Sequence, residues 1–459
     1  MTDPNQSLRE YAGKLLATQI FFEAMACIDV RRAMHERIRK QADQLIFRSD
    51  QYGSESLVSI KRSPSVIAFG KAAGSMALAL NDILEGPVEA GVLVSTTIPE
   101  ERPARFSCFA GGHPYPNDGS LRGAAAALEL VSGRVPDDLV IFLISGGGSA
   151  LFEKPLDGSV TLDDLVEFNK ALVTGELPIE QINTLRKHIS AVKGGRLAIA
   201  ASPAEQLTIF ISDVPENHDS MVASGPTMPD SSTAEECYAL ARDHHLLDQF
   251  PVSIRRYFGQ RSLPETPKPG DTGFGRSRYC RLLSNADAVE AARGAAENAG
   301  LVTKVDEGRW DADFRKVARA NCAALDDLAA ENPGRPVCLV VGGEATCPVT
   351  GNGVGGRNQA FALEAARLIT GRNRAVLSAG TDGRDGNSPA AGAVADGQTI
   401  SRAKARNLDP SRYIAASDSY HFFRALGDTI EVGYTGNNVR DLRLWIDLGV
   451  ESSGDRDAS

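Results

Sequence analysis

The sequence lacks the features that mark membrane, secreted and nucleic-acid-binding proteins. Its 459 residues contain no apolar run long enough to span a bilayer. The first ten residues, MTDPNQSLRE, have neither the basic flank nor the apolar core of a signal peptide. No segment is rich in Lys and Arg, and the net charge is −10. We therefore expect a cytoplasmic protein whose partners are neither membranes nor nucleic acids.

Several catalytic and metal-binding motifs are also missing. The seven cysteines are scattered without a CxxC pair, so neither a zinc site nor a disulfide framework is indicated. Reduced thiols of this kind are typical of the cytosol. The sequence contains no GxSxG elbow, no HExxH helix and no GxxxxGK[ST] P-loop. An enzyme of phosphoryl transfer would therefore hold its nucleotide without a P-loop.

Glycine, in contrast, is abundant at 44 residues, while aromatic residues make up only 6%. This composition suits a fold with many tight strand-to-helix turns. The chain is too long for a single core of ordinary size, so we expect two domains. Residues 262–275 form the segment richest in Pro and Gly. We place the boundary there and predict domains over residues 1–270 and 271–459.

Predicted strands and helices alternate along both domains. A helical pattern runs from Leu8 to Arg48. The strands that follow are expected at 65–70, 91–96, 105–112, 139–144, 206–212, 301–305 and 337–345. The helices between them are expected near 117–132, 161–174, 179–201, 235–245, 285–300, 311–330 and 357–369. The alternation predicts an α/β fold with a larger N-terminal, doubly wound, Rossmann-like sheet and a smaller C-terminal α/β domain.

The strand at 139–144 ends in a glycine-rich loop. The loop consists of Ser145, Gly146, Gly147, Gly148 and Ser149. Three residues without a Cβ atom let backbone N–H groups converge on an anion, and the flanking serines add hydroxyl donors. Ligands of open α/β sheets bind beyond the carboxyl ends of the strands, where this loop falls. Taken alone, the loop fits an anion site and a flexible junction equally well.

A lysine follows another strand end. Gly70 and Lys71 come directly after the strand at 65–70, at the expected first turn of a helix. A cation beside helix N-terminal N–H groups suits a phosphate or carboxylate. A lysine is electrostatically disfavoured at a helix N-terminus, and this misfit favours a functional role over that of a surface residue.

Two aspartates also lie at strand ends. Asp213 follows the strand at 206–212, and Asp382 follows a strand in AVLSAGTDGRDG, with Asp385 in the same loop. Carboxylates in such positions often hold Mg²⁺ beside substrate phosphates, whereas a single one is more often a cap or turn residue. Two of them make a metal site between the domains a reasonable expectation.

The segment 342–359 contains GxGxxG at Gly351, Gly353 and Gly356, a dinucleotide-binding pattern. This pattern belongs in a tight strand–helix turn, but here about a dozen residues separate strand and helix. The spacing favours a long loop over a nicotinamide site. Arg357, at the end of the loop, is a candidate for stabilising charge on a transferred phosphoryl group.

A basic run occupies residues 182–198. Arg186 and Lys193 are seven residues apart, so on a continuous helix they would share a face. A solvated basic face is the ordinary interpretation of such a run. Its position between two glycine-ended strands makes a role toward phosphate an alternative.

Together these segments resemble the glycerate kinases that have an N-terminal glycerate kinase domain and a C-terminal MOFRL domain. The resemblance lies in VIAFGKAAGSMA, GGHPYPNDGS, FLISGGGSALF, INTLRKHISAVKGGRLA, ISDVPEN with ASGPT, VGGEATCPVTGNGVGGRNQ and SAGTDGRDG. These runs extend from about residue 66 to residue 438 and occur in one order, which makes the resemblance specific.

The resemblance implies ATP- and Mg²⁺-dependent phosphorylation of D-glycerate, most often to 2-phosphoglycerate, in a cleft between two α/β domains. It implies that Lys71 and Arg357 occupy the family's catalytic lysine and arginine positions. The strand-end carboxylates Asp213 and Asp382 are our candidates for binding the metal or accepting the hydroxyl proton. The substrate- or nucleotide-binding residues expected from the motifs are Gly70, Ser145, Gly146, Gly147, Gly148, Ser149, Arg186, Lys193, Asn217, Glu344 and Asn358.

Two departures from the family pattern leave alternatives open. NSPAAGA at 387–393 stands where a Pro-Thr-Asp-Ala run is usual, and YTGNN at 434–438 replaces Pro-Thr-Gly-Thr-Asn. These departures leave a kinase of a related hydroxy acid and a non-catalytic anion- or nucleotide-binding protein as alternatives. A third alternative, an NAD(P)H-dependent hydroxypyruvate reductase, rests on Gly351, Gly353 and Gly356 and on the label hydroxypyruvate reductase that some members carry. The sequence does not distinguish a monomer from a homodimer.

Overall fold

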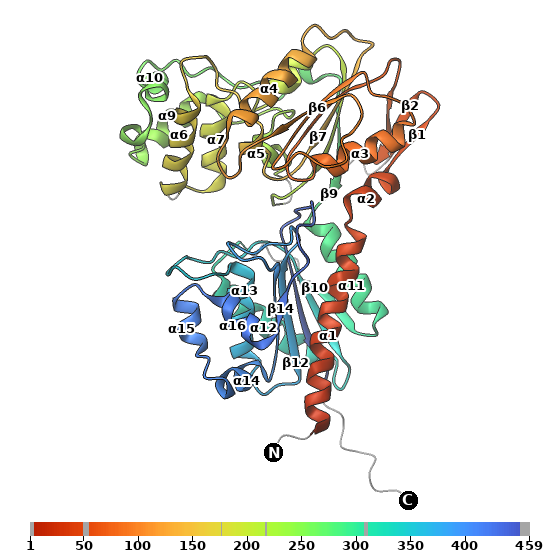
Figure 1. The fold of residues 1–459 in the computed structure, drawn as a ribbon, viewed down its shortest axis with the longest axis vertical. Coiled ribbons are helices and arrows are strands. Elements are labelled where there is room, and N and C mark those ends of the chain that lie inside the picture. The colour runs from red at the N-terminus through yellow and green to blue at the C-terminus, as the bar shows by residue number, and fades with distance from the viewer. Residues whose placement is uncertain (1–3, 49–54, 176, 216–217, 307–310, 450–459) are drawn as a thin grey trace, which may run out of the picture. The chain divides into compact units, whose positions relative to one another are not determined.

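A computed structural model describes residues 4–48, 55–175, 177–215, 218–306 and 311–449. The chain forms two compact units (Figure 1). Unit 1 comprises residues 1–29 and 284–459, and unit 2 comprises residues 30–283. Unit 2 is therefore one continuous segment of chain, whereas unit 1 is assembled from both ends of the sequence.

The elements of unit 2 are α2 (Val30–Arg37), β1 (Ile38–Gln41), β2 (Gln44–Arg48), β3 (Glu55–Ser59), β4 (Ser65–Phe69), α3 (Ala73–Leu84), β5 (Ala90–Ser95), β6 (Phe106–Ala110), α4 (Asp118–Val131), β7 (Leu139–Ile144), α5 (Gly148–Leu151), α6 (Leu162–Thr174), α7 (Ile179–Ile189), α8 (Arg196–Ala201), β8 (Glu205–Ile211), α9 (Ala234–Asp243), α10 (Val252–Gly259) and β9 (Ser277–Leu283).

The elements of unit 1 are α1 (Pro4–Cys27), α11 (Asn285–Asn298), β10 (Val302–Asp306), α12 (Phe314–Glu331), β11 (Val337–Val341), α13 (Arg357–Leu368), β12 (Arg374–Gly380), β13 (Gly392–Asp396), α14 (Thr399–Ala405), α15 (Pro410–Ala415), α16 (Ser419–Leu426), β14 (Thr429–Ile430) and β15 (Asp441–Asp447).

The main sheet of unit 2 has the strand order β6-β5-β4-β7-β8-β9, and all five pairings are parallel. Counted along the chain, this is the 3-2-1-4-5-6 order of the Rossmann fold. The order reverses between β4 and β7, so the loops that follow these two strands lie side by side. The central strands β4 and β7 are buried throughout, as continuous apolar runs in a parallel sheet should be.

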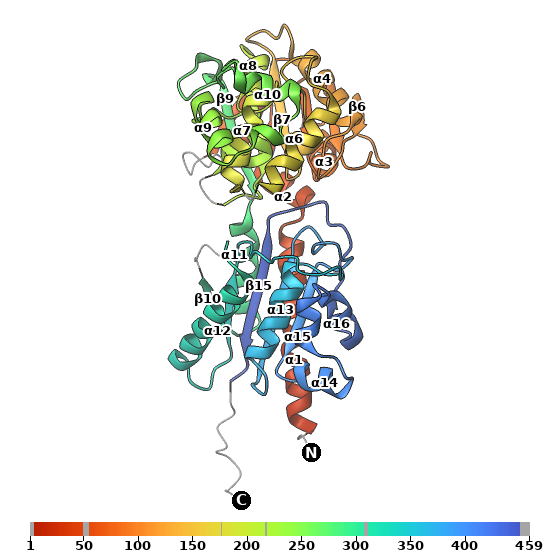
Figure 2. The ribbon, with the colours of Figure 1, turned by 90° about the vertical axis from the view of Figure 1, so that its left-hand side faces the viewer.

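Helices cover both faces of that sheet. Residues of α4 and α8 pack with β4, β5 and β7 in one apolar core. On the opposite face, α3 contacts β4 and β5, and α2 contacts α3. A second apolar core joins α6, α7, α9 and α10 into a helical cluster (Figure 2). A small antiparallel sheet, β1-β2-β3, completes the unit.

The sheet of unit 1 has the order β10-β11-β15-β12-β13-β14. Only β10 and β11 pair in parallel, while β15 runs antiparallel to both β11 and β12. Because β15 runs the other way, its first residues lie beside the last residues of its two neighbours: Arg443 pairs with Val341 and Asp441 with Gly380. This register determines which charged side chains meet at that edge.

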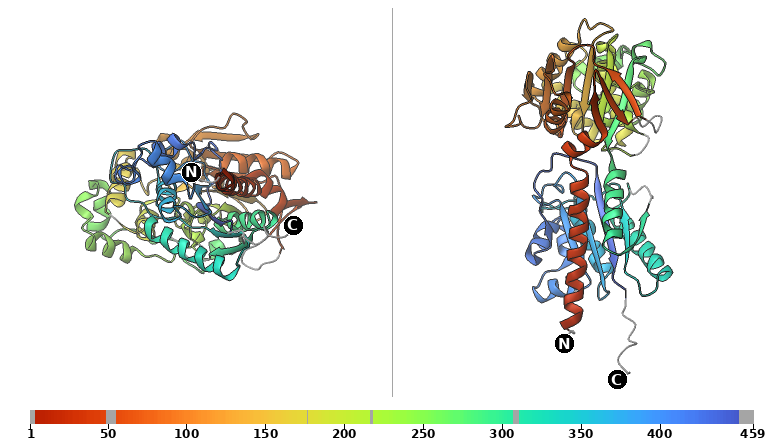
Figure 3. Two further views of the ribbon diagram at one scale, coloured as in Figure 1. Left: turned by 90° about the horizontal axis from the view of Figure 1, so that it is seen from below. Right: turned by 90° about the vertical axis from the view of Figure 1, so that its right-hand side faces the viewer.

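Unit 1 is also layered. Helices α1 and α11 pack on one face of the sheet, through residues such as Phe21 and Ala292 against Leu377 and Leu444. Helices α12 and α13 pack on the other face, around Trp445 (Figure 2). The red helix α1 can be followed from the N-terminus along this unit in Figure 3. The first helix of the chain therefore belongs to the core of the C-terminal unit.

The structure differs from the sequence-based boundaries in three places. The two units meet at Leu283/Ser284 and not at 270/271, because β9 pairs with β8 and so belongs to unit 2. Residues 38–48, predicted as helix, form β1 and β2, where Leu45 and Phe47 are buried with the period of a strand. The helix predicted over 179–201 is interrupted after Ile189.

No helix in the described part of the chain is long and apolar enough to cross a membrane.

Candidate functional site

The loops after β4 and β7 are fastened to each other where the strand order reverses. The Ala72 N–H donates to Ser145 Oγ at 2.9 Å, and the Lys71 N–H donates to the Gly146 carbonyl at 2.9 Å. Gly70 has a φ of +115°, and a Cβ atom there would lie 2.3 Å from Ser145 Oγ. Only glycine fits between the two loops at this position.

The glycine-rich loop presents backbone donors. Within the described residues, neither the Gly146 N–H nor the Gly147 N–H donates a hydrogen bond. Gly147 adopts φ +81° and precedes the single turn of α5, which begins at Gly148. A Cβ atom on Gly148 would lie 2.6 Å from Ala223 Cβ, so this position is tightly packed. The loop is therefore a fixed structure with two amides available to an anion.

Two side chains flank this loop. An added Cβ atom on Gly147 would lie 3.4 Å from Lys71 Cγ and 3.2 Å from His113 Cδ2. Lys71 lies in the turn just before α3, two residues ahead of the helix start rather than inside its first turn. His113 follows β6 and is exposed. The fold thus brings His113 close to Lys71, although no sequence pattern assigned it a role.

The far side of the loop is held by hydroxyl groups. Ser149 Oγ lies 2.9 Å from Ser224 Oγ, which donates to Asn183 at 2.9 Å. Ala223 and Ser224 both have positive φ values, +51° and +62°. This left-handed conformation is uncommon for residues with a Cβ atom and often accompanies functional sites.

The predicted basic face of residues 182–198 does not exist as a solvated surface. Helix α7 ends at Ile189, so Arg186 and Lys193 do not share a helix face. Lys193 is fully buried and pairs with the buried Glu153, which also accepts a hydrogen bond from Ser190 Oγ at 2.6 Å. Burial lowers the pKa of Lys193, and Glu153 opposes that effect. Lys193 therefore supports the fold beneath the loop, and its predicted contact with a ligand stays a prediction.

Arg186 remains a candidate for contact with a ligand. Its Nε donates to Asn169 at 2.7 Å, which fixes the guanidinium group. Burial lowers its pKa, and the neighbouring Glu153 and Tyr115 act in the opposite direction. A partly desolvated arginine with a fixed guanidinium group is well suited to a carboxylate or phosphate.

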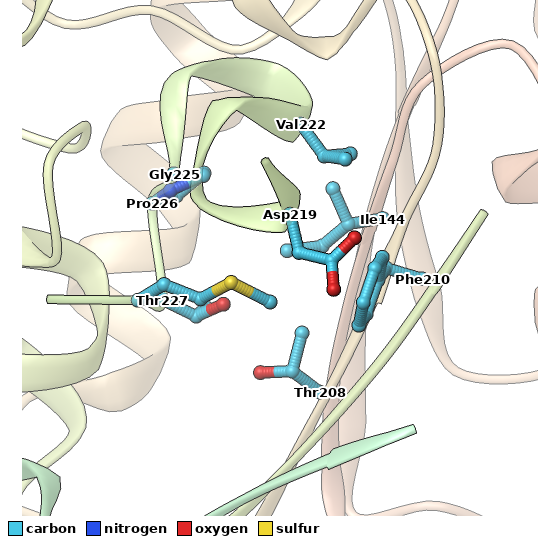
Figure 4. Close-up of a pocket in the computed structure, with 9 residues that line it drawn as sticks. Ile144, Thr208, Phe210, Asp219, Val222, Gly225, Pro226 and Thr227 are labelled. Atoms are coloured by element: carbon cyan, nitrogen blue, oxygen red, sulfur yellow. The ribbon is translucent and has the colours of Figure 1, made fainter. Parts of the chain in front are cut away.

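Asp213 follows β8 by two residues and is half-buried. Asn217, a predicted ligand, lies outside the described residues. A small pocket beside β8 is lined by Asp219, whose carboxylate also pairs with Arg281 (Figure 4). Its volume of about 10 Å³ has room for about one water molecule. We therefore do not assign the nucleotide to it.

The second group of predicted residues lies in unit 1, at the edge where β11 and β12 end and β15 begins. Arg357 is the first residue of α13. Its Nε and Nη2 donate to Asp441 Oδ2 and Oδ1 at 2.7 and 2.9 Å, and its Nη1 lies 2.9 Å from Glu344. Burial disfavours its charge, but Asp441 outweighs this effect and raises the pKa of Arg357. The guanidinium is thus permanently charged and held at two points.

Asn358 is buried next to it. Its side-chain amide donates to Asp441 Oδ1 at 2.9 Å and accepts from Ser378 at 2.6 Å. Both ends of the amide are occupied inside the protein. Asn358 therefore supports Asp441, and its predicted contact with a ligand stays a prediction.

Asp385 caps helix α13. Its carboxylate accepts the backbone N–H groups of Asn358 and Gln359 at 3.0 and 2.8 Å. Burial raises the pKa of Asp385 to about 7, although both N–H groups and the nearby Arg357 favour the charged form. The start of the helix that carries Arg357 is thus fixed by a carboxyl group that titrates near neutrality.

Asp382 and Glu344 occupy more exposed positions in the same unit. Asp382 Oδ1 accepts the Arg384 N–H at 3.1 Å, as a turn residue does. Glu344 contacts Arg357 and, at 3.4 Å, Arg440. No group of three or more His, Cys, Asp or Glu side chains suited to a metal occurs in the described ranges. A single strand-end carboxylate still fits Mg²⁺ that is bound mainly through substrate phosphates.

The GxGxxG glycines serve packing within unit 1. A Cβ atom on Gly351 or Gly353 would lie 2.5–2.6 Å from the Ala416 carbonyl, and the Gly353 N–H donates to that same oxygen. The connection between β11 and α13 spans residues 342–356, so it is not the tight turn of a dinucleotide site. The geometry supports the sequence-based argument against a nicotinamide site.

Comparison with known proteins places the chain in a family. A model described as a domain of unknown function, DUF4147, matches residues 16–259, and the MOFRL family model matches residues 337–441. The D-glycerate 2-kinase of Thermotoga maritima is 36% identical over 382 residues, which cover 82% of this chain and 89% of that protein. The chain belongs to the glycerate kinase family. The resemblance inferred from the sequence is thereby confirmed.

Other members of the glycerate kinase family match over similar lengths. The glycerate 2-kinase of Pyrococcus horikoshii is 32% identical and covers 92% of this chain and 95% of its own. A relative from Agrobacterium vitis, 37% identical over 82% of this chain and 86% of its own, is named as a candidate hydroxypyruvate reductase. The crystal structure of the Thermotoga maritima glycerate kinase superposes with a TM-score of 0.80 at 32% identity, over 95% of this chain and 99% of that one. The two-domain α/β fold is that of the family.

Asp441, Glu153 and His113 were not identified from the sequence. Asp441 and Arg443 stand two residues apart in a buried apolar strand, so they share one face of it, and this pattern was the available signal. Glu153 follows the glycine-rich loop by four residues and had no pattern of its own. Its importance depends on Lys193, which is distant in sequence.

Proposed function

We propose that this chain transfers the γ-phosphoryl group of ATP to a hydroxyl group of D-glycerate, giving ADP and 2-phosphoglycerate. The observation that carries the proposal is the pair of N–H groups of Gly146 and Gly147, which lie beside Lys71 at the point where the strand order of unit 2 reverses. Loops at such a point are where open α/β sheets bind phosphate-bearing ligands. The names of the glycerate kinase relatives support D-glycerate as the acceptor.

Unit 2 supplies the anion site in this proposal. The amides of the loop and the ammonium group of Lys71 receive phosphate oxygens, while Arg186 receives a phosphate or the glycerate carboxylate. Gly70 and Ser145 keep the two loops in register. Ser149 anchors the far end of the loop through Ser224.

Unit 1 supplies Arg357. In the reaction, a P–O bond forms to the glycerate hydroxyl oxygen and the bond between the γ-phosphorus and the β,γ-bridging oxygen breaks. The hydroxyl proton leaves to a base. Negative charge spreads over the transferred phosphoryl oxygens, and a fixed guanidinium group stabilises it. That Arg357 and Lys71 act in the same turnover stays a prediction from the sequence.

Mg²⁺ fits the donor chemistry of Asp213, and Asp382 is the corresponding carboxylate of unit 1. When bound with ATP, Mg²⁺ neutralises phosphate charge. Each aspartate follows a strand end, and each is a single carboxylate rather than part of a protein-only cage. Which of the two holds the metal and which accepts the hydroxyl proton is assigned by their separate replacement with asparagine.

The activity is tested by incubating the protein with D-glycerate, ATP and Mg²⁺ and measuring ADP. A parallel sample receives hydroxypyruvate and NADH. We expect ADP formation that requires D-glycerate, with no loss of NADH. NADH oxidation without ADP formation would replace the kinase by the reductase, and neither signal would leave an anion-binding protein. Phosphorus NMR of the product separates 2- from 3-phosphoglycerate.

Two variants test the assigned cations. We expect Lys71→Ala and Arg357→Ala each to lower kcat by about 10³-fold, because each removes a charge from the transferred phosphoryl group. Lys61→Ala and Arg372→Ala remove exposed cations paired with Asp137 and Asp326, and they should leave kcat within about twofold. Near-normal turnover by either site variant would remove that residue from the proposal.

Cytoplasmic location and a monomeric or homodimeric state stay predictions. Size-exclusion chromatography with light scattering measures the molar mass in solution and so decides between monomer and homodimer.

A further inference from the structure

The guanidinium group of Arg357 is fixed before any ligand arrives. Asp441 accepts from Arg357 Nε at 2.7 Å and from Nη2 at 2.9 Å, which is the two-point geometry that arginine forms with carboxylates. The Asp441 side chain is 0% exposed, whereas that of Arg357 is 34% exposed. The carboxylate therefore holds the inner edge of the guanidinium, while the outer edge, with Nη1, faces the half-exposed Glu344 at 2.9 Å.

Asp441 is itself held in place. Asn358 Nδ2 donates to its Oδ1 at 2.9 Å, and Arg443 Nη2 lies 3.5 Å from its Oδ2. Arg443 is buried, donates to the Gly342 carbonyl at 2.9 Å, and lies over the ring of Phe361. The position of the carboxylate is thus set by groups from strand β15, helix α13 and the end of β11.

Two carboxylates and one further guanidinium group surround Arg357. A carboxylate that contacts an arginine reduces the attraction of that arginine for phosphate. Here Arg443 compensates the buried Asp441, whereas Glu344 contacts Nη1 of Arg357 from a half-exposed position. Burial and the Arg357 guanidinium act in opposite directions on Asp441, and the guanidinium prevails, so the pKa of Asp441 stays below its usual range.

We propose that Asp441 is the positioning residue of Arg357: it orients the guanidinium so that the outer edge meets the transferred phosphoryl group. This inference rests on the proposed kinase function. Asp441 does not touch the substrate. It acts by removing the rotational freedom of a long side chain in advance, so that this freedom is not lost in the transition state.

The alternative is that the pair only stabilises unit 1. The two roles differ in what happens when Arg357 is absent. If Asp441 acts through Arg357, replacement of Asp441 has no further effect on kcat in an Arg357→Ala background. If Asp441 only stabilises the fold, its replacement should act independently of Arg357.

The experiment is a double-mutant cycle with wild type, Asp441→Asn, Arg357→Ala and the double variant, measured as kcat, KM for D-glycerate and melting temperature. We expect Asp441→Asn to lower kcat by about 10²-fold with KM changed less than about threefold, since a small misplacement of a catalytic group has this effect. Arg357→Ala should lower kcat by about 10³-fold, and the double variant should match it within about twofold.

A matched control lies at the other end of the same strand. Asp447 accepts from the buried Arg374 at 2.7 Å, so Asp447→Asn breaks a comparable pair without touching Arg357. We expect Asp447→Asn to lower the melting temperature while kcat stays within about twofold. If Asp441→Asn does not fold, Asp441→Glu decides, because it keeps the buried charge and displaces the carboxylate by one methylene group. That variant should lose at least about tenfold in kcat.

Several results would overturn the proposal: wild-type kcat in Asp441→Asn or Asp441→Glu, an additive loss in the double variant, or an equal loss of kcat in Asp447→Asn. A wild-type protein that forms no ADP from D-glycerate and ATP would refute the proposed function instead. The two failures are therefore distinguishable.

Discussion

At the scale of single residues, the molecule pairs its important cations with buried carboxylates. Lys193 meets Glu153 in unit 2, and Arg357 meets Asp441 in unit 1. A buried charge without a partner costs several kcal/mol, so each carboxylate makes its cation tolerable in the interior. The two pairs differ in exposure: Lys193 is enclosed, whereas Arg357 is partly exposed.

Asp385 leads to a prediction about pH. Burial raises its folded-state pKa from the ordinary value of 3.8 to about 7, while Asp441 raises it further and Arg357 lowers it. The folded state then binds more protons than the unfolded state between about pH 4 and pH 7. Asp385 therefore stabilises the folded state at the acidic end of that window. This contribution, up to about 4 kcal/mol of unfolding free energy, is lost as the pH rises through the folded-state pKa.

Asp385→Asn should remove this dependence, because the amide is neutral and keeps one acceptor for the helix cap. Urea unfolding of wild type and Asp385→Asn at pH 5 and pH 8 measures this pH dependence of the unfolding free energy. We expect the stability of wild type relative to the variant to decrease from pH 5 to pH 8. A difference that stays constant across this range would contradict the assignment.

The sequence predicted single residues well where a strand end and a glycine coincide. Lys71 and the glycine-rich loop do lie together, because parallel strands end at one edge. The prediction failed where a partner comes from a distant segment. Lys193 looked like a surface cation because Glu153 is 40 residues away in sequence, and Asp441 is separated from Arg357 by 84 residues. Spacing rules describe neighbours on one element and not pairs formed by folding.

At the scale of elements, the junction of the loops after β4 and β7 depends on one glycine. Gly70→Ala should displace the Ser145 loop, because the new Cβ would lie 2.3 Å from Ser145 Oγ and 2.4 Å from its carbonyl oxygen. We expect kcat to fall by about 10²-fold, since Lys71 and the loop amides would move relative to each other. The melting temperature should fall as well.

Gly133→Ala is the matched control. Gly133 also has a positive φ, +72°, but nothing lies within 4 Å of its added Cβ. Gly133→Ala should lose only about 1 kcal/mol in unfolding free energy, which is the cost of a Cβ atom at positive φ, and its kcat should be unchanged. Equal activity of Gly70→Ala and Gly133→Ala would mean that the close approach to Ser145 has no functional importance.

Elements were predictable where a clear period extended over the whole segment. The buried strands β4, β7 and β8 coincide with continuous apolar runs. Residues 38–48 were assigned to a helix because the helical pattern preceding them was extended too far. The short alternation of Leu45 and Phe47 specifies β2, and pairing with β1 and β3 stabilises it.

At the scale of the whole molecule, unit 1 depends on the first helix of the chain. Lys14 of α1 is buried between Asp396 and Asp428, at 3.1 and 2.8 Å. Lys14→Met would leave these carboxylates with Arg402 as their remaining close cation, so we expect a loss of about 3–5 kcal/mol in unfolding free energy. Gln19→Met, on the exposed side of the same helix, should change it by less than about 0.5 kcal/mol.

The same arrangement predicts the behaviour of fragments. Residues 30–283 form unit 2 without a break, so this fragment should unfold cooperatively on its own. Residues 284–459 alone should not, and they should regain a cooperative transition when residues 1–29 are fused to them. Circular dichroism during thermal unfolding tests both. A stable 284–459 fragment would show that α1 is dispensable.

The boundary between units could not be read from composition. The stretch at 262–275 is rich in Pro and Gly, yet it lies inside unit 2, ahead of β9. The actual division follows from strand pairing, because β9 completes the parallel sheet. A composition signal marks an irregular segment, but only pairing shows which sheet the next strand joins.

Because unit 1 is built from two distant segments of the chain, these segments are synthesised at different times. Helix α1 is synthesised before unit 2, and β15, which lies in the middle of the sheet that α1 covers, is synthesised after it. At elongation rates of about 5–20 residues per second, the roughly 400 residues between them take about 20 to 80 s to synthesise. During that time the sheet against which Ile20 and Phe21 of α1 pack has not yet formed. Unit 2 can fold during this interval. Residues 30–283 therefore reach their folded structure before unit 1, which needs both of its segments.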